Sequence, residues 1–396
     1  MASITTVYPE NYRPAVYLDP LALIDFDVAT FSEKSSTAFT IDVHNNQYVL
    51  TIRGSGFRYA GDGQPTQGVI TEIHGIQNGT PTYDIEDVQI SVASLTTWLA
   101  VGGPYPLFAG DDIVMGGSSS DTFFGYDGHD VVSGGPGADH INGGAGNDHI
   151  YGQSSGGGLD GPDTLSGDEG SDYLQGNAGD DRIDGGAGSD RINGGSGNDF
   201  IFGGSGLPNG PPAGNDTVNG NLGDDTIIGD NGNDSLRGGQ GNDQIQGGDG
   251  NDVLMGDKGN DVLSGGRGYD LFTGGEGSDV FRFDDPRDAS AVAAEFTTTG
   301  PDAYRVDIVT DFHHGEDHLA FSTPQNILVG AATDAQAAAT LAQTLLDNNP
   351  GDSETAAIGV GHDTYLFFHL NSSTVQAAVL LIGVNPGEIT ASDFGF

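Results

Sequence analysis

Aspartate recurs at a fixed place in a long glycine-rich stretch, where it is well suited to bind a metal ion. Between Gly116 and Phe283 the sequence repeats with a period of nine, as in GGAGNDHIY, GGSGNDFIF and GGDGNDVLM, and every unit keeps one aspartate. Carboxylates in turns rich in backbone carbonyls favour calcium, a hard cation that takes about six to eight oxygen ligands. The candidate metal ligands are the seventeen repeat aspartates: Asp121, Asp130, Asp139, Asp148, Asp163, Asp172, Asp181, Asp190, Asp199, Asp216, Asp225, Asp234, Asp243, Asp252, Asp261, Asp270 and Asp279.

An apolar residue stands two positions after each of these aspartates, from Phe123 in the first unit to Phe281 in the last. Three residues of alternating polarity are enough for a short strand. The six glycine-rich residues of each unit form a turn that needs positive φ angles and room for an ion. The units therefore predict short strands with a periodic line of core residues, separated by turns that carry the aspartates.

The repeat resembles G-G-x-G-x-D-x-U-x, the calcium-binding nonapeptide of the RTX family. The resemblance implies an all-β dominated chain whose centre is a parallel β-roll, flanked by a small β-rich N-terminal domain and a C-terminal α+β/β capping domain. In this family the ions lie between successive turns on one edge. Units n and n+2 share an ion through their aspartates and nearby carbonyls, so the resemblance implies multiple Ca²⁺ ions as the cofactor, held by the seventeen aspartates.

The charge of the chain restricts its partners. With 57 acidic and 12 basic residues, the formal net charge is −45. Such a field repels nucleic acid and anionic membranes, and no apolar run is long enough for membrane insertion. The chain has no cysteine, so disulfides and thiolates contribute nothing. Calcium ions are the expected partner.

Disorder is the alternative interpretation of a segment so rich in glycine, asparagine and aspartate. The strict period of both the aspartates and the apolar residues argues against it. Residues 116–283 nevertheless carry 28 acidic and 6 basic residues, a net charge of −22. Without cations the turns repel one another, so we expect this segment to be disordered until calcium folds it. Extracellular calcium suits weak sites of this kind.

The two ends of the chain suggest a route of export. The N-terminus, MASITTVYPEN, has neither the positive segment nor the apolar run of a signal peptide. The C-terminus, NPGEITASDFGF, resembles the uncleaved signal of type I secretion substrates. We therefore expect an extracellular protein that is secreted by type I machinery, with retention at the cell surface as an open alternative.

The period divides the chain into four segments. We predict an N-terminal β-rich domain at residues 1–106, the RTX calcium-binding β-roll at 107–283, a linker at 284–302, and a C-terminal cap with the export signal at 303–396. A solenoid leaves its ends open unless other segments cover them. A capping role is therefore expected for both flanking domains.

Local patterns predict elements within the flanking domains. Alternating apolar residues around an Asn-Asn turn predict a hairpin over residues 39–52, with further strands near 68–74 and 83–90. Apolar spacing predicts a short helix over 91–100 and an amphipathic helix over 333–348 with a Thr or Asp start signal. The segments HDTYLFFHL and QAAVLLIGV predict two strands near the C-terminus.

The segment YRVDIVTDFHHGEDHLAFS resembles the cap that follows the roll in serralysin-type proteins. The family pattern is D-x-I-x-D-F-x-x-G-x-D-x-L. The residues that carry the resemblance are Asp307, Ile308, Asp311, Phe312, Gly315, Asp317 and Leu319. The resemblance implies that this segment closes the C-terminal end of the roll.

No catalytic constellation is expected. The zinc protease pattern H-E-x-x-H is absent, and His313, His314 and His318 in HHGEDH are interpreted as solvated or structural. Residues 152–156 match G-x-S-x-G, but they lie between repeats and lack the strand-to-helix context of an esterase. The chain also lacks the apolar region of a pore-forming toxin. We predict that it is not an enzyme.

Two functions from different classes remain. The first is a secreted structural component of the cell surface, such as a surface layer, adhesin or matrix protein, whose partner is a surface component or the protein itself. The second is a soluble binding module or enzyme whose active part is the N-terminal domain, with the roll serving export and stability. A calcium store or sensor is a weaker third.

Overall fold

The structure is a computed structural model of the 396-residue chain. The chain forms two compact units, residues 1–187 and 188–396. Within them the structure describes residues 29–32, 38–43, 48–59, 65–77, 80–91, 111, 113–115, 120, 122–153, 160–204, 213–283, 306–320, 326–348, 354–368 and 377–394.

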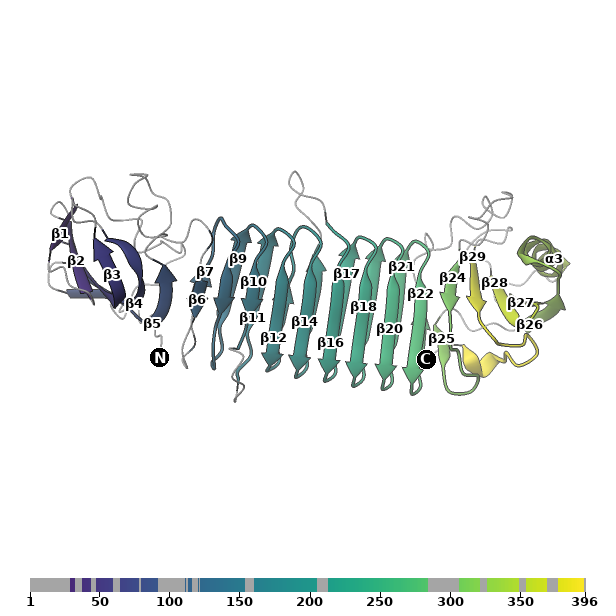
Figure 1. Cartoon of the computed structure of the whole chain (residues 1–396). Coiled ribbons are helices and arrows are strands. Elements are labelled where there is room, and N and C mark those ends of the chain that lie inside the picture. Colours follow the sequence, from purple (N-terminus) through teal and green to yellow (C-terminus); the bar gives the residue numbers. More distant parts are fainter. Residues whose placement is uncertain are drawn as a thin grey trace. The chain divides into compact units, whose positions relative to one another are not determined.

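The first unit begins with a five-stranded antiparallel sheet (Figure 1). Its strands are β1 (Ala29–Ser32), β2 (Ala38–Val43), β3 (Tyr48–Tyr59), β4 (Pro65–Gln77) and β5 (Thr80–Ser91). The pairing of Val43 with Tyr48 confirms the predicted hairpin, and β4 and β5 are longer than the strands expected there. The helix predicted over residues 91–100 lies, beyond Ser91, outside the described residues.

The first unit continues with short parallel strands that pair in two series. The strands are β6 (Ile113–Met115), β7 (Thr122–Phe124), β8 (Val131–Ser133), β9 (His140–Ala145), β10 (His149–Tyr151), β11 (Thr164–Glu169), β12 (Tyr173–Ala178) and β13 (Arg182–Asp184). Within this unit, β6, β8, β10 and β12 form one series and β7, β9, β11 and β13 the other. Because β6 pairs with β8, the roll includes a strand before the first full repeat.

The second unit repeats this architecture. Its parallel strands are β14 (Arg191–Ser196), β15 (Phe200–Gly204), β16 (Thr217–Leu222), β17 (Thr226–Asn231), β18 (Ser235–Gln240), β19 (Gln244–Asp249), β20 (Val253–Lys258), β21 (Val262–Arg267), β22 (Leu271–Glu276) and β23 (Val280–Arg282). Leu236 on β18 pairs with Leu254 on β20, and Ile245 on β19 pairs with Leu263 on β21. Two nonapeptides therefore make one turn of the solenoid, as a parallel β-roll requires.

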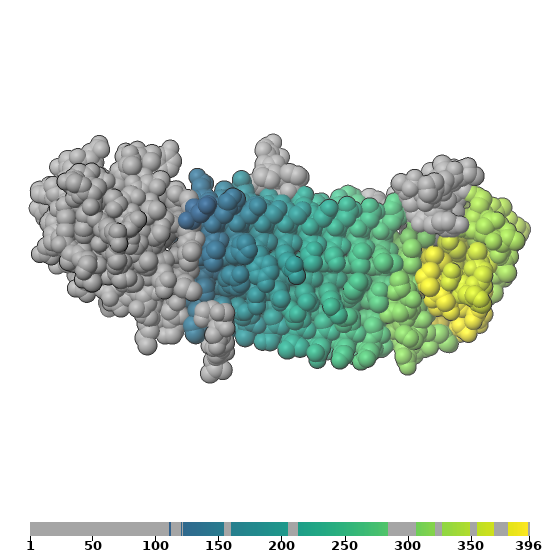
Figure 2. Space-filling view, in the orientation of Figure 1, coloured from purple at the N-terminus to yellow at the C-terminus, as the bar shows by residue number. Residues whose placement is uncertain are grey.

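The apolar residue of each repeat points between the two sheets. Leu254, Leu263, Phe272 and Phe281 are each 0% exposed. Phe272 and Phe281, on neighbouring repeats of the two sheets, meet edge to face with ring centroids 6.1 Å apart. On the face seen in Figure 2, residues 213–283 form a continuous surface, and these apolar side chains are buried beneath it. The predicted periodic core is confirmed in the described repeats.

A C-terminal α/β segment continues the two sheets of the second unit (Figure 1). Its elements are β24 (Asp307–Val309), β25 (His318–Ala320), β26 (Asn326–Ala331), α3 (Ala335–Asn348), β27 (Glu354–Val360), β28 (Asp363–Phe368), β29 (Ala377–Leu381) and the 3₁₀ helix η2 (Ala391–Asp393). Strand β24 pairs with β22 of the roll and with β29, while β25 pairs with β23.

Helix α3 packs against the β26–β28 part of this extended sheet. Ala338, Ala342 and Leu346 are buried in a cluster with Ile358 and Phe367. The helix begins after Asp334, whose carboxylate accepts a hydrogen bond from the backbone N–H of Ala337 at 2.8 Å, as expected of an N-cap. The predicted amphipathic helix is confirmed. No helix within the described residues is both long and apolar enough to span a bilayer.

Replacing one core residue tests the packing of the roll. Leu254 is 0% exposed, so Leu254→Ala removes packed methyl groups and leaves a cavity. We expect the free energy of unfolding to fall by about 2 to 5 kcal/mol, measured by denaturant unfolding at saturating calcium. The neighbouring Met255 is 37% exposed, so Met255→Ala is the matched control. Equal losses for the two variants would contradict the arrangement of the core.

Candidate metal-binding edges

The repeat aspartates are buried in the turns at the edges of the roll. Sixteen of the seventeen are described, and Asp121 lies outside the described residues. The described sixteen are between 0% and 3% exposed. Aspartate is almost never fully buried unless its charge is paired, so a repeated set of buried carboxylates requires a compensating interaction.

In most of these carboxylates, Oδ1 accepts a hydrogen bond from the backbone of the neighbouring turn. The backbone N–H of Asp225 donates to Oδ1 of Asp243 at 2.8 Å, and the backbone N–H of Asp243 donates to Oδ1 of Asp261 at 2.8 Å. Equivalent bonds join aspartates throughout the described turns of both units. We call this series the aspartate ladder; the period of nine alone does not predict it. The ladder positions each carboxylate that takes part in it by a bond to the backbone.

The second oxygen, Oδ2, lacks a hydrogen bond in many of these carboxylates. For ten aspartates Oδ2 is buried and has no partner in the described structure: Asp148, Asp163, Asp216, Asp225, Asp234, Asp243, Asp252, Asp261, Asp270 and Asp279. A buried oxygen that carries negative charge and lacks a partner is strongly destabilising. These atoms therefore mark where a cation would be stabilising.

Glycine leaves open the space that Oδ2 faces. A Cβ at Gly247, the first residue of its turn, would collide with Oδ2 of Asp252 and with the carbonyl oxygen of Gly265 on the next turn. At the second position, Gly248 has a φ of +122° and lies against the carbonyl oxygen of Asp230. The edge thus brings carboxylate and carbonyl oxygens together around glycine. These are the hard ligands that calcium takes.

The number of acidic side chains at any one point is small. Within the described ranges, no three His, Cys, Asp or Glu side chains gather as a metal-binding group. The oxygens that do converge are one carboxylate oxygen per turn and the neighbouring backbone carbonyls. This donor set fits a hard cation bound between turns.

Burial makes these carboxyls weak acids in the calcium-free fold. Removal from water is the main cause that raises the pKa of Asp252 to about 7 and that of Asp243 to about 6. Nearby aspartates add to the shift, while the backbone hydrogen bond of the ladder opposes it. The turn therefore favours a neutral carboxyl unless a cation compensates its charge.

A second ladder runs through the residue before many of the aspartates. The backbone N–H of Asn260 donates to Oδ1 of Asn242 at 2.9 Å, and Ser278 N–H donates to Oδ1 of Asn260 at 2.9 Å. Here the side chain of the earlier turn accepts from the later turn, whereas the aspartate of the later turn accepts from the earlier turn. The recurrent Asn-Asp pair in the sequence was the available signal for this arrangement.

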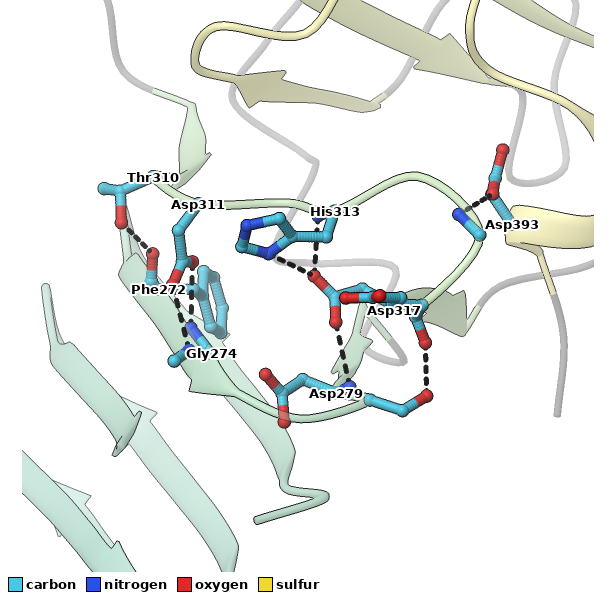
Figure 3. A network of polar contacts seen from close by, with 12 residues as sticks. Phe272, Gly274, Asp279, Thr310, Asp311, His313, Asp317 and Asp393 are labelled. Atoms are coloured by element: carbon cyan, nitrogen blue, oxygen red, sulfur yellow. Dashed lines mark hydrogen bonds and ion pairs between the residues drawn. The ribbon is translucent and has the colours of Figure 1, made fainter. Parts of the chain in front are cut away.

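The aspartate ladder extends into the C-terminal segment (Figure 3). The backbone N–H of Asp270 donates to Oδ1 of Asp307, and that of Asp279 donates to Oδ1 of Asp317, both at 3.0 Å. Oδ2 of Asp317 accepts from the backbone N–H of His313 at 2.7 Å. Asp317 therefore has protein donors for both oxygens, unlike Asp279 below it.

Asp311 takes the place of a backbone segment at the end of the roll. In a regular turn the first two glycine N–H groups donate to carbonyls of the next turn, as Gly134 and Gly135 do. At the last such turn of this edge, Gly274 and Gly275 instead donate to the two carboxylate oxygens of Asp311, both at 2.9 Å (Figure 3). A side chain thus satisfies the donors that a further turn would have met.

The histidines of this segment make local contacts. His314 Nδ1 lies 2.8 Å from Asp393 Oδ1, and Asp393 is 0% exposed. The side chain of His313 is 58% exposed, with Nδ1 3.6 Å from Asp317 Oδ2, and His318 is held in β25. These histidines therefore lie in the C-terminal segment and contact its own residues. Of the G-x-S-x-G match, residues 154–156 lie outside the described residues.

Comparison with protein families identifies the repeats. Seven segments match the RTX calcium-binding nonapeptide repeat: residues 108–141, 124–155, 157–192, 176–206, 213–245, 228–263 and 246–281. RTX nonapeptide repeats bind multiple Ca²⁺ ions and are typical of secreted proteins. The matched segments include all of the predicted metal ligands.

Solved structures with some similarity include two repeat subunits of the mannuronan C5-epimerase from Azotobacter vinelandii. AlgE6R3 is 28% identical, with 41% of this chain and 78% of that chain covered and a TM-score of 0.29. AlgE6R2 is 25% identical, with 45% and 91% covered and a TM-score of 0.23. The extracellular lipase LipA from Serratia marcescens is 18% identical, with 66% and 40% covered and a TM-score of 0.20. No curated protein matches the chain.

The raised pKa values predict how the calcium-free chain responds to pH. Folding raises the pKa of Asp163 from 3.8 to about 8, and the pKa values of Asp243 and Asp252 also rise. The folded state thus binds more protons than the unfolded state between about pH 4 and 8, so its stability falls as the pH rises through this window. In calcium-free buffer we expect a more compact chain with more β-structure at pH 5 than at pH 8.

Circular dichroism and hydrodynamic radius, followed across the pH series, check this expectation. Calcium competes with protons for the same carboxylates. The calcium concentration that half-saturates the folded chain should therefore rise as the pH falls, and equilibrium calcium binding at each pH is the control. Greater order at pH 8 than at pH 5 without calcium would contradict the assignment.

Proposed function

We propose, from the premise that residues 108–281 carry RTX calcium-binding repeats, that the repeat aspartates are the calcium ligands and that calcium folds the roll. Each ion would bind at an edge of the roll, between one turn and the turn two units later. The aspartates would supply their Oδ2 atoms, and the glycine-rich turns would supply backbone carbonyl oxygens. Bound calcium would neutralise the buried carboxylates without displacing the hydrogen bonds of the ladder.

The observation that carries this proposal is the series of buried Oδ2 atoms without partners. In the absence of cation, each turn must bury a charge, protonate the carboxyl, or unfold. Neighbouring turns repeat the same problem, and the net charge of −22 over residues 116–283 adds repulsion between them. Bound calcium would compensate the buried charges and reduce the repulsion between turns, so calcium binding and folding would be coupled.

We further propose that the protein is secreted and acts as a structural component of the cell surface. Repeats of this kind are typical of secreted proteins, and the C-terminal tail resembles a type I secretion signal. Most of the chain is roll and flanking segments, with the predicted domains at residues 1–106, 107–283 and 303–396 around a linker. Calcium that bridges acidic faces of neighbouring copies would support assembly into a layer or matrix.

The N-terminal sheet supports a second candidate function. Strands β1–β5 pair only with one another among the described strands and form a sheet of their own. Such a module could bind a soluble ligand or carry an activity, with the roll serving export and stability. The measurement of particle size separates this function from the first.

Replacing one ladder aspartate tests the ligand assignment. Asp252→Asn keeps an oxygen that can accept the hydrogen bond from Asp234 N–H but removes the charge at Oδ2. We expect the variant to bind fewer calcium ions or to bind them with lower affinity. The calcium concentration at the folding midpoint should rise by about tenfold, as measured by equilibrium calcium binding and circular dichroism. The control is Glu276→Gln, which removes one charge from an exposed residue of a turn. Equal behaviour of the two variants would contradict the assignment.

Particle size tests the structural role. The full chain, freed of calcium and then returned to millimolar calcium, is followed by light scattering and electron microscopy, with magnesium as the control cation. Growth into regular sheets or filaments with calcium alone is the expected result. Compaction to a lasting monomer would contradict autonomous assembly and favour the N-terminal module.

A further inference from the structure

An additional aspartate lies where the chain returns to the roll after an insertion. Asp160 precedes the repeat aspartate Asp163 by three residues and occupies the third position of its turn. It is not one of the aspartates that recur in every unit, so the repeat pattern alone does not single it out. Asp160 is half-buried, whereas the third positions of other turns include exposed side chains such as Glu169.

The carboxylate of Asp160 replaces a backbone carbonyl. In regular turns the fourth residue donates its N–H to the carbonyl of the third residue of the next turn, as Gly146 does to Glu169 at 2.7 Å. Gly137 instead donates to Oδ1 of Asp160 at 3.3 Å, and Gly161 donates to the same atom at 3.1 Å. These two bonds hold the carboxylate of Asp160 at the edge of the roll.

Two buried carboxylate oxygens without hydrogen-bond partners belong to this one turn. Oδ2 of Asp160 is buried and has no hydrogen-bond partner. Oδ2 of Asp163 is also buried without a partner, and Asp163 is only 2% exposed. A Cβ at Gly152 would collide with Asp163 Oδ2 and with the carbonyl oxygen of Gly176. The turn therefore offers the usual oxygens of the edge together with a second acidic side chain.

The charge of Asp160 reaches the ladder carboxyls of two turns. Burial is the main cause that raises the pKa of Asp163 to about 8, and the negative charges of Asp181, Asp160 and Asp139 add to it. Asp160 also contributes to the raised pKa of Asp181, which is about 6. The electrostatic coupling agrees with the geometry.

We propose that Asp160 is an additional calcium ligand and that the turn of residues 160–163 fills with calcium at a lower concentration than the turns of residues 213–283. The proposal rests on the proposed function, because it assumes that calcium binds at the edge. The added carboxylate gives this site one more negative charge than a regular turn has. Ligand charge is a main determinant of calcium affinity, and a tight site at the point of re-entry secures the turn that the insertion interrupts.

A purely structural role for Asp160 predicts something different. If the carboxylate only replaces a carbonyl, an uncharged acceptor should serve equally well. Asp160→Asn keeps the side-chain oxygen for Gly137 and Gly161 and removes the charge. Glu169→Gln is the matched control, because Glu169 has the same position in the repeat, its backbone carbonyl makes the regular bond, and its side chain is exposed.

Hydrogen exchange read by mass spectrometry during a calcium titration of the full chain tests the proposal. In the unchanged protein, peptides that cover 134–153 and 160–181 should gain protection at lower calcium than peptides that cover 213–283. Asp160→Asn should raise the midpoint of the first group on the order of tenfold and leave the second unchanged. Glu169→Gln should change neither.

The outcomes separate this inference from the proposed function. If calcium protects the whole roll but Asp160→Asn has the same midpoints as the unchanged protein, Asp160 is a structural acceptor and the inference is wrong. If calcium protects no part of residues 122–283 in the unchanged protein, the proposed function fails first. Loss of all protection in Asp160→Asn at saturating calcium would also overturn the inference, because one ligand should not control every turn.

Discussion

The burial of one carboxylate in every turn is the constraint on which the rest of the roll depends. The aspartate ladder uses Oδ1 to fix each carboxyl against the backbone of the adjacent turn, as between Asp243 and Asp261. The same bond leaves Oδ2 inside the protein, beside glycine and a carbonyl oxygen. A hydrogen-bond network that binds the turns together thus also concentrates negative charge between them. Stability then depends on the neutralisation of that charge, which a divalent cation shared by the oxygens of two turns would achieve under the proposed function.

This constraint explains which parts of the repeat can vary. The first insertion follows Gln153 and the second follows Gly204, so both interrupt a turn after its second residue. The chain returns at Gly161 and Gly214 with the fourth glycine and the sixth aspartate intact. A Cβ at Gly214 would meet the carbonyl of Gly188, as the fourth glycine of a regular turn meets its counterpart. Insertions are therefore tolerated after the second residue of the turn, whereas the later part of the turn, which carries the aspartate of the ladder, is kept.

Features that recur in every unit could be predicted from the sequence, and features that occur once could not. The period of aspartate and apolar residue predicted the short strands and the buried line that includes Leu254 and Phe272, and the resemblance to the RTX repeat implied that the strands are parallel. The ladder could not be predicted, because it depends on which carboxylate oxygen meets an amide of the next turn. Asp160 stands outside the period, so its role required the backbone geometry. Helix α3 has a local pattern and was predicted, whereas β26 and β27 depend on long-range pairing and were not.

The C-terminal segment shows how the roll ends. Two features of a regular turn are reproduced by side chains, since Asp307 and Asp317 continue the ladder and Asp311 receives the glycine N–H groups. The segment does not repeat the open carboxylate, because Oδ2 of Asp317 is bonded to His313 N–H. Hydrogen bonding therefore continues into the cap while the series of open oxygens stops at Asp279. The carboxylates of this segment accept the backbone N–H groups of the last turns, so the end of the roll keeps its hydrogen bonds without a further repeat.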